Sequence, residues 1–294
     1  MTKEAISVVI PTYKRIKDLS LTLTNIYSCN PLPLEIIVHV DFGDLDTREF
    51  LKNNFPQVVV LNSKEPVGPG GGRNVGIKYA KNNYVASFDD DSFPIDNNYF
   101  ANLTKYFKLF PLAVVIEAAI YHKDEQVNPP EKTCFEKHNF TGCGSAYRKD
   151  LFLKLGGFIP KPVAYGIEEV DLSIRALEKK MMIVGCKELR VLHNTNLKHH
   201  QSTKINAGLI TNSALFVYLR YPYQLYFYGF LQVMNKIFFA VTNKRYNGIF
   251  KGLVDIPSTI KKYKQYRRVI PRGVIKNFLE KRSLSKRIYD EVNF

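Results

Sequence analysis

The segment Tyr84-Val-Ala-Ser-Phe-Asp-Asp-Asp-Ser-Phe-Pro94 decides how the rest of the chain can be interpreted. Its first five residues form a short apolar, β-prone run, which is typical of a buried strand. Asp89, Asp90 and Asp91 follow at once, so the three carboxylates fall where that strand leaves its sheet. Ligands bind at this edge in open α/β sheets.

These three adjacent carboxylates repel one another unless a cation or hydrogen-bond donors offset the repulsion. Their hard oxygen atoms suit Mg²⁺ or Mn²⁺, which usually join one or two carboxylates to the phosphates of a substrate. A solvated acidic turn is the other interpretation. The residues around the acids have to decide between the two.

The composition is that of a globular protein. The chain has 294 residues, of which 45% are hydrophobic and 23% charged, enough for one large α/β domain or one domain with an appendage. The four cysteines (Cys29, Cys134, Cys143 and Cys186) show no metal-binding spacing, which predicts reduced core thiols. Because no cleavable signal precedes the first apolar run, we expect a cytoplasmic location.

The formal net charge of +15 is concentrated in the last third of the chain. Residues 201–294 hold 17 Lys and Arg against four Asp and Glu, whereas residues 1–200 hold 25 against 23. We therefore expect a domain over 1–200 and a separate basic region over 201–294. The excess of positive charge predicts an anionic partner, either a membrane surface or nucleic acid.

Apolar runs alternate with helical spacing along the first hundred residues. Strands are expected at 6–10, 34–40, 58–61 and 84–88, with a helix near 18–27. This order predicts an α/β fold with a doubly wound, mostly parallel sheet flanked by helices. The polar residues that follow the strands, and that we expect to meet at one edge of the sheet, are Thr12, Asp41, Arg73 and the three acids.

The segment Gly68–Gly76 is rich in glycine and follows the third expected strand. We expect it to be a loop before a helix, an arrangement that binds phosphate through backbone N–H groups. The glycine spacing matches neither the Rossmann fingerprint nor the P-loop. Arg73 would offer a forked contact to a phosphate or a base. A flexible surface turn is the alternative.

Beyond the acids, residues 112–121 predict another strand and residues 122–139 a polar loop. Small residues fill 141–146, where they would allow close approach of a ligand or of another backbone. Two further strands are expected at 181–185 and 188–192.

A second acidic cluster lies where a helix is expected to begin at Val170. Its members, Glu168, Glu169 and Asp171, are either stabilised by the helix dipole or include a general base. His193 follows the last expected strand. It is either an ordinary surface or core residue, or a metal ligand.

Taken in order, these motifs resemble the inverting glycosyltransferases of family 2, which have the GT-A fold. The resemblance covers residues 4–200. It is carried by Val-Val-Ile-Pro-Thr-Tyr-Lys-Arg at 8–15, Glu-Ile-Ile-Val at 35–38, Gly-Arg-Asn-x-Gly at 72–76 and Phe-Asp-Asp-Asp at 88–91.

The resemblance implies a role for each candidate residue. The Asp-x-Asp metal motif of the family maps onto Asp89 and Asp91, and His193 would complete the metal site. Glu169 would be the general base, with Glu168 and Asp171 as the other candidates. The residues that would contact the nucleotide sugar are Pro11, Thr12, Tyr13, Arg15, Asp41, Arg73, Asp89 and Asp90.

We therefore expect a metal-dependent inverting glycosyltransferase that uses Mn²⁺ or Mg²⁺. It would move a sugar from a nucleotide-diphosphate donor to a hydroxyl of a saccharide or lipid-linked acceptor, in cell-surface polysaccharide or glycolipid assembly. A sugar-phosphate nucleotidyltransferase stays open, since it would also use an α/β sheet, a glycine loop and a metal. The basic tail suggests a nucleic-acid-binding protein, but the acidic site has no role there, so we expect no nucleic acid partner.

The C-terminal region is unusually aromatic over residues 218–230, and segments rich in Lys and Arg follow at 244–287. The uncharged stretches on either side of Arg220 are about 15 residues long, shorter than the roughly 20 residues that span a bilayer. Aromatic and basic residues together suit a membrane interface. We expect a helical region peripheral to the inner face of the cell membrane, with packing on the catalytic domain as the alternative.

Overall fold

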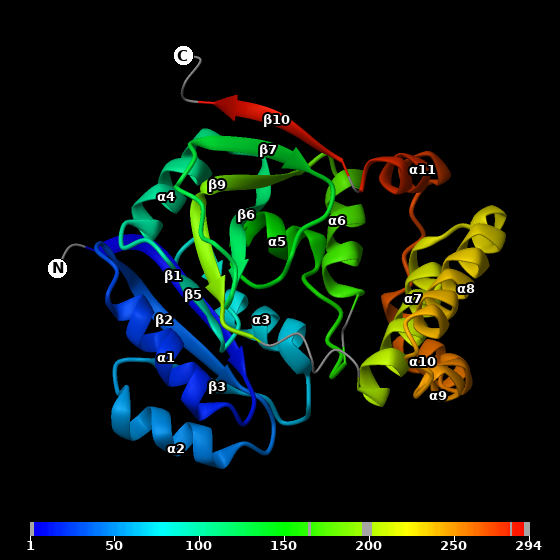
Figure 1. Cartoon of the computed structure of the whole chain (residues 1–294), viewed down its shortest axis with the longest axis horizontal. Helices are drawn as coiled ribbons and strands as arrows, with labels where there is room; N and C mark the ends of the chain where they lie inside the picture. Colours follow the sequence, from blue (N-terminus) through cyan, green and yellow to red (C-terminus); the bar gives the residue numbers. More distant parts are fainter. Residues whose placement is uncertain (1–2, 164–165, 196–201, 283, 291–294) are drawn as a thin grey trace.

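The protein is built around one mixed β-sheet (Figure 1) with the strand order β10-β7-β9-β6-β8-β4-β1-β2-β3, to which β5 is added through β9. The structure is a computed structural model that describes residues 3–163, 166–195, 202–282 and 284–290. Helices lie against the faces of the sheet, and the C-terminal helices form a group to one side. The expected α/β fold with a mostly parallel sheet is confirmed for the N-terminal half.

The parallel half of the sheet arises from the apolar runs of the first 90 residues. Its strands are β1 (Lys3–Thr12), β2 (Leu32–Val40), β3 (Val59–Asn62) and β4 (Tyr84–Ser87). The helices between them are α1 (Ile16–Tyr27), α2 (Leu45–Asn54) and α3 (Gly68–Tyr79). Val8 pairs with Ile36 on one side and Ala86 on the other, and all three are buried. Strands covered on both faces read as continuous apolar runs, which is why the sequence predicted them.

The second half of the sheet is mixed. Its strands are β5 (Ser92–Pro94), β6 (Ala113–His122), β7 (Thr133–Lys137), β8 (Ser145–Arg148) and β9 (Met182–His193), and its helices are α4 (Tyr99–Leu109), α5 (Lys149–Leu155) and α6 (Glu168–Glu178). Strand β8 runs antiparallel to both β4 and β6, whereas β6 and β9 are parallel.

Two expectations for this half were wrong. The polar loop expected at 122–139 contains β7, which is only partly buried and includes the charged residues Glu136 and Lys137. The two strands expected at 181–185 and 188–192 are one strand, β9. An irregularity in its register with β6 lies between Cys186 and Arg190, and such a bulge interrupts the alternation of side chains.

The glycine-rich segment is not a loop, because α3 begins at Gly68 itself. Its glycines allow close packing. A Cβ atom on Gly76 would lie 2.5 Å from Val9 of β1, and one on Gly72 would lie 2.7 Å from His39 of β2. A methyl group at either place would push the helix off the sheet. The sequence prediction failed here because glycine usually breaks a helix and its packing role is visible only in three dimensions.

The C-terminal region is helical, as expected, and ends in a strand that was not expected. It contains α7 (Thr203–Arg220), α8 (Tyr226–Thr242), α9 (Ile249–Val254), α10 (Ile256–Tyr263), α11 (Arg272–Lys281) and β10 (Ser285–Asp290). Strand β10 returns to the sheet and pairs with β7 (Figure 1). The division into 1–200 and 201–294 stays a prediction.

Candidate active site

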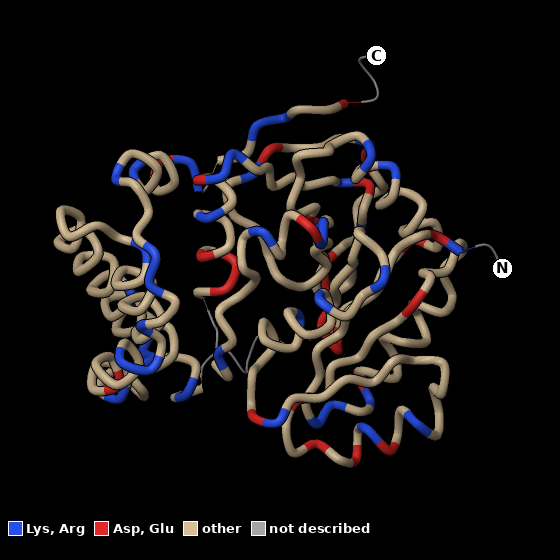
Figure 2. The backbone as a smooth tube through the Cα atoms, turned by 180° about the vertical axis from the view of Figure 1, so that it is seen from behind, with Lys and Arg blue, Asp and Glu red and all other residues tan. Residues whose placement is uncertain are grey.

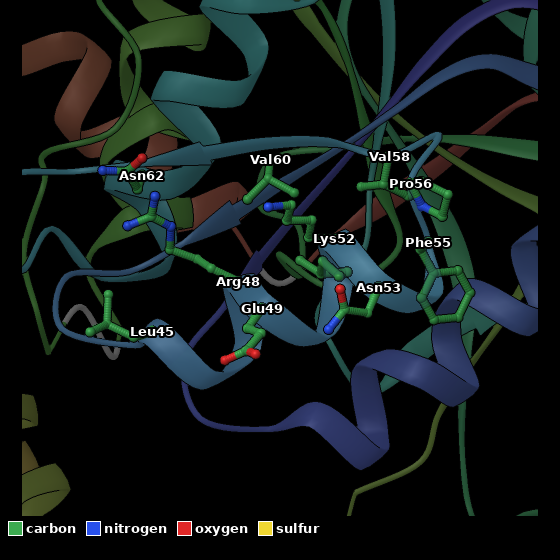
Figure 3. Close-up of a pocket in the computed structure, with 11 residues that line it drawn as sticks. Leu45, Arg48, Glu49, Lys52, Asn53, Phe55, Pro56, Val58, Val60 and Asn62 are labelled. Carbon is green, nitrogen blue, oxygen red and sulfur yellow. The ribbon is translucent and has the colours of Figure 1, made fainter.

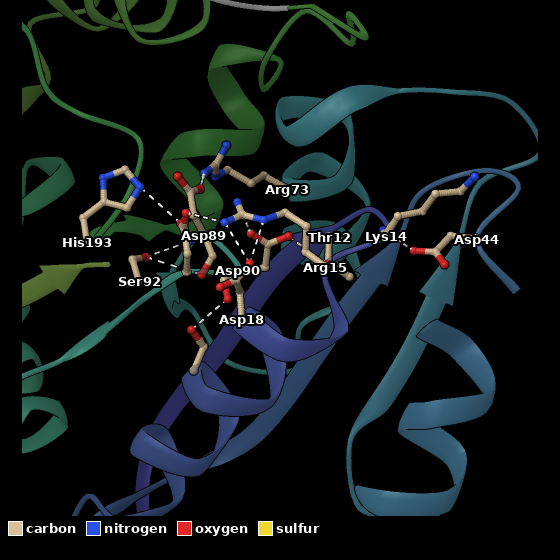
Figure 4. A network of polar contacts seen from close by, with 12 residues as sticks. Thr12, Lys14, Arg15, Asp18, Asp44, Arg73, Asp89, Asp90, Ser92 and His193 are labelled. Carbon is tan, nitrogen blue, oxygen red and sulfur yellow. Dashed lines mark hydrogen bonds and ion pairs between the residues drawn. The ribbon is translucent and has the colours of Figure 1, made fainter. Parts of the chain in front are cut away.

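The three acids lie in the tight turn that joins β4 to β5, at the carboxyl end of the parallel strands. Strand β5 is antiparallel to β9, and Ser92 pairs with His193. This pairing carries His193 to the acids, as Figure 4 shows. The sequence did not predict β5, so the proximity of His193 to Asp91 could be expected only from the family resemblance.

Asp90 is held inside the turn by hydrogen bonds from two elements. Thr12 Oγ1 donates to Asp90 Oδ2 at 2.9 Å, and Thr22 Oγ1 donates to the Asp90 carbonyl oxygen at 2.9 Å. Arg15 Nη1 lies 2.8 Å from Asp90 Oδ1. Burial raises the pKa of Asp90 to about 7, although Arg15 opposes the rise. Asp90 therefore fixes the turn to β1 and α1.

Asp91 is buried between two basic groups, Arg15 and His193. Arg15 Nη2 lies 2.8 Å from Asp91 Oδ2, and His193 Nε2 lies 3.1 Å from Asp91 Oδ1. Burial alone would raise the pKa of Asp91, but His193 and Arg15 outweigh it and lower the pKa to about 2. The pKa of His193 is raised: burial on its own would lower it, but the carboxylates of Asp91 and Asp89 outweigh burial. Asp91 is thus ionised at neutral pH.

Asp89 is the most exposed of the three acids and forms an ion pair with the buried guanidinium of Arg73. Arg73 Nε donates to Ser87 Oγ at 3.2 Å, and Arg73 Nη1 lies 3.7 Å from Glu168 Oε2. Arg73 therefore joins the acids after β4 to the acids at the start of α6. This link was not predicted.

Asp89, Cys143 and His193 form a group of metal-ligating type. One ligand atom from each lies within 4.8 Å of the other two. Cys143 Sγ is 3.6 Å from His193 Nδ1, and burial raises the pKa of the Cys143 thiol. No local sequence signal marks Cys143, because its partners are more than 45 residues away along the chain. The fold alone brings them together.

Glu168 and Glu169 begin α6 and differ in their surroundings. Glu168 is buried, and its Oε1 accepts a hydrogen bond from the Gly70 N–H at 2.8 Å. Burial and the neighbouring Glu169 raise the pKa of Glu168 to about 8. Glu169 is only half-buried, with Gly142 beside its carboxylate, and burial raises its pKa as well. Glu168 therefore holds α3 in place, while the Glu169 side chain stays partly exposed.

Asp171 lies away from this group and is tied to two arginines. Arg175 Nε donates to Asp171 Oδ2 at 2.9 Å, and Arg220 donates to both carboxylate oxygens from the end of α7. Burial would raise the pKa of Asp171, but the two arginines lower it. All three side chains are almost fully buried. Asp171 thus binds α6 to α7 rather than facing the pocket.

Asp41 follows β2 and occupies the N-terminus of α3. Its Oδ1 accepts from the Val67 N–H at 3.1 Å and its Oδ2 from the Gly68 N–H at 3.0 Å. The sequence suggested that backbone N–H groups at the start of this segment bind a phosphate. Those of Val67 and Gly68 instead donate to the Asp41 carboxylate. The helix dipole stabilises a negative charge at this place.

One pocket of about 920 Å³ contains nearly all of the predicted site residues. Asp171 is the one predicted residue outside its lining. Predicted residues in the lining are Pro11, Thr12, Tyr13, Arg15, Asp41, Arg73, Asp89, Asp90, Asp91, Glu168, Glu169 and His193. A separate hollow of about 640 Å³ lies between α2 and β3 (Figure 3). It contains none of these residues, so the larger pocket is the candidate active site.

Comparison with solved structures shows a likeness in fold. S. aureus TarS (residues 1–349, with UDP-GlcNAc) has a TM-score of 0.57 and 15% identity over 74% of this chain and 66% of its own. GalNAc-T7 with UDP, GalNAc and Mn²⁺ has a TM-score of 0.56 and 16% identity over 74% and 48%. The mannosyltransferase PcManGT from Pyrobaculum calidifontis, with GDP-Man and Mn²⁺, has a TM-score of 0.56 and 13% identity over 94% and 79%.

This chain therefore spans less than two thirds of the TarS fragment and about half of GalNAc-T7. None of the curated proteins matches it. The architecture common to these structures is the GT-A-like arrangement that the sequence motifs implied. The sequence profile described as Glycosyl transferase family 2 matches residues 7–165, more than half of the chain. The chain thus belongs to glycosyl transferase family 2.

Proposed function

We propose that the protein is a metal-dependent inverting glycosyltransferase that moves a sugar from a nucleoside-diphosphate donor to a hydroxyl acceptor. The observation that supports this most is that a partly exposed acid, Glu169, lines the same pocket as the group Asp89, Cys143 and His193. Glu169 would take the proton from the acceptor hydroxyl as it attacks the anomeric carbon. A single displacement inverts that carbon, as in one-step glycosidases.

The residues present fit a divalent metal ion. Asp91 Oδ1 is buried and accepts no hydrogen bond of good geometry within the described part of the chain, although it lies 3.1 Å from His193 Nε2. Neighbouring ligands of an octahedral ion with bonds of about 2.1 Å are about 3.0 Å apart. Asp91 and His193 would therefore hold Mn²⁺ or Mg²⁺, with Asp89 beside them. When bound, such an ion neutralises the charge that develops on the leaving diphosphate.

The remaining pocket residues would hold the nucleotide. Arg73 is buried and charged, and it would stabilise phosphate charge, although Asp89 neutralises it in the absence of donor. Pro11, Thr12 and Tyr13 line the pocket at the end of β1. The named structures hold uridine or guanosine diphosphate ligands, so UDP and GDP sugars are the first donors to test.

A donor screen tests this function. We expect one nucleotide sugar, with Mn²⁺, to raise the melting temperature, since ligand at about 100 times its Kd stabilises the fold by about 2.7 kcal/mol. Asp91→Asn should abolish the Mn²⁺-dependent part of this shift, because it removes a charged ligand.

Asp18→Asn is the matched control. It removes an exposed carboxylate that also contacts Arg15, at 3.0 Å, but lies outside the pocket lining. Undiminished Mn²⁺-dependent binding by Asp91→Asn would remove Asp91 from the metal site. If no UDP, GDP or dTDP sugar shifts the melting temperature, the proposed function fails.

We further propose that the C-terminal region holds the enzyme at the inner face of the cell membrane, beside a lipid-linked acceptor. The turn that precedes α8, α8 itself and α9 expose a set of large apolar side chains that we call the aromatic face: Tyr223, Phe227, Tyr228, Phe230, Phe238 and Phe250. Each is at least 55% exposed. No helix among the described residues is long and apolar enough to cross a bilayer.

Charge favours an anionic bilayer as the partner of the aromatic face. Figure 2 shows Lys and Arg distributed over the C-terminal helices, with few acids among them. Lys236, Lys244 and Lys251 are exposed on or near α8 and α9. Aromatic side chains enter the headgroup region, and each Lys or Arg near an anionic surface adds about 1 kcal/mol.

We expect the purified full-length protein to sediment with anionic vesicles more than with neutral ones, and salt to weaken this binding. The triple variant Phe227→Gln, Phe230→Gln, Phe238→Gln should lose it. Leu112→Gln, which alters an exposed apolar residue before β6, is the control. Failure to sediment with either vesicle, or a dimer that only the triple variant disrupts, would contradict membrane docking and assign the aromatic face to packing or self-association.

A further inference from the structure

His193 presents its two ring nitrogens to two chemically different neighbours. Nε2 lies 3.1 Å from the carboxylate oxygen Oδ1 of Asp91, and Nδ1 lies 3.6 Å from the sulfur of Cys143. Oxygen ligands suit Mg²⁺ and Mn²⁺, whereas a thiolate selects softer ions such as Zn²⁺. The His193 ring thus has an oxygen side, where Nε2 faces Asp91, and a sulfur side, where Nδ1 faces Cys143.

The distances on the sulfur side fit a tetrahedral ion. Zinc bonds are about 2.3 Å to sulfur and about 2.0–2.1 Å to a histidine nitrogen, so two such ligands at the tetrahedral angle lie about 3.5 Å apart. Cys143 Sγ and His193 Nδ1 are 3.6 Å apart. An oxygen of Asp89 lies within 4.8 Å of the ligand atoms of both. Three protein ligands with a fourth position open to the pocket is a common arrangement for zinc.

Asp91 supplies the support that a zinc-bound histidine usually has. A ligating imidazole commonly directs its other nitrogen at a carboxylate, which fixes the ring. Asp91 is almost fully buried and held by Arg15 at 2.8 Å, so its position is set independently of His193. The ring is therefore oriented in advance with Nδ1 toward Cys143.

We propose that Cys143, His193 and Asp89 form an inhibitory site for a thiophilic divalent cation, with Zn²⁺ as its representative. On binding, the Cys143 thiol releases its proton to the solvent and the thiolate bonds to the ion. One neutral imidazole ligates one metal at a time. Zinc on Nδ1 thus withdraws His193 and Asp89 from the proposed Mn²⁺ or Mg²⁺ site. The inhibitory consequence rests on the proposed function, whereas zinc binding itself does not.

Zinc binding is measured on the full chain by equilibrium dialysis, with no nucleotide present. We expect one bound Zn²⁺ per chain, with affinity at least about tenfold weaker in Cys143→Ala. Co²⁺ in place of zinc should give a thiolate-to-cobalt charge-transfer absorption that Cys143→Ala lacks. The matched control is Cys186→Ala, which removes a thiol from the buried pair Cys134–Cys186, whose sulfurs are 2.8 Å apart.

Three results would overturn the inference. The first is that the wild-type chain binds no zinc. The second is that Cys143→Ala binds zinc as tightly as the wild-type chain. The third is that Cys186→Ala, and not Cys143→Ala, loses zinc binding. If binding is confirmed, zinc should reduce the Mn²⁺-supported turnover of the wild-type enzyme. The fraction of activity that zinc removes should be smaller in Cys143→Ala, measured against the activity of that variant without zinc. Absence of zinc binding with an intact Mn²⁺-dependent donor shift would refute this site alone. Zinc binding without any donor shift would refute the proposed function alone.

Discussion

Replacing Glu169 with Gln is expected to lower the turnover number by about 10²–10⁴-fold while the donor binds with nearly unchanged affinity. Gln keeps the size of the side chain but cannot accept the proton of the acceptor hydroxyl. Glu169 is half-buried and lines the pocket. The measurement is steady-state kinetics on the donor found in the screen, together with donor affinity by calorimetry.

The pH dependence gives a second check on Glu169. Burial raises the pKa of its carboxyl group, and only the ionised form can act as a base. In the wild-type enzyme the turnover number should therefore fall as pH decreases through this raised pKa. The residual activity of Glu169→Gln should not show this acidic limb, since the group that titrates is absent.

Glu168→Gln is the matched comparison, because it makes the same replacement of a carboxyl group by an amide at the adjacent residue. Glu168 accepts from the Gly70 N–H and lies near Arg73. Gln keeps an oxygen that can accept from Gly70, so Glu168→Gln should lower the turnover number far less than Glu169→Gln does. If Glu168→Gln instead reduced turnover at unchanged donor affinity, while Glu169→Gln remained active, the role of base would belong to Glu168.

The second large effect concerns stability. Arg220→Met should lower the free energy of unfolding by about 3–5 kcal/mol at most, the usual cost of breaking a buried ion pair, because Asp171 keeps only Arg175 as its partner. Arg220 is buried, binds both oxygens of Asp171, and donates to the carbonyl oxygens of Tyr266 at 3.0 Å and Arg268 at 3.2 Å. Urea denaturation followed by circular dichroism measures the change.

Arg268→Met is the control, since the Arg268 side chain pairs with Glu178 at the surface. Exposed ion pairs contribute only about 0–1 kcal/mol. Equal stability of Arg220→Met and Arg268→Met would contradict a structural role for the Asp171–Arg220 pair. For the same reason, truncation at residue 200 would damage the catalytic domain and is a poor test of membrane docking.

Sequence reasoning predicted the elements whose side chains follow a simple rule. Strands β1, β2 and β4 are largely buried and read as apolar runs, and the acids after β4 lie at the sheet edge where they were expected. The rule failed where a residue's role depends on a distant partner. Gly72 and Gly76 serve helix packing on β1 and β2, Cys143 meets His193 from 50 residues away, and Asp171 is tied to Arg220.

The strand β10 was missed for a related reason. Residues 285–290 are largely polar, and their extended form comes from pairing with β7 rather than from an apolar pattern of their own. Secondary structure that depends on a neighbour in this way leaves little local signal.

The pairing of Ser285 with Lys137 also sets an order of events during synthesis. Strand β7 leaves the ribosome long before its partner, and all of the helices from α7 to α11 are made in between. Until β10 arrives, one edge of the sheet offers unpaired N–H and C=O groups, which are templates for association with another chain. Contacts so distant along the chain also form slowly. The edge of β7 therefore stays open to association with another chain until β10 emerges and pairs with it.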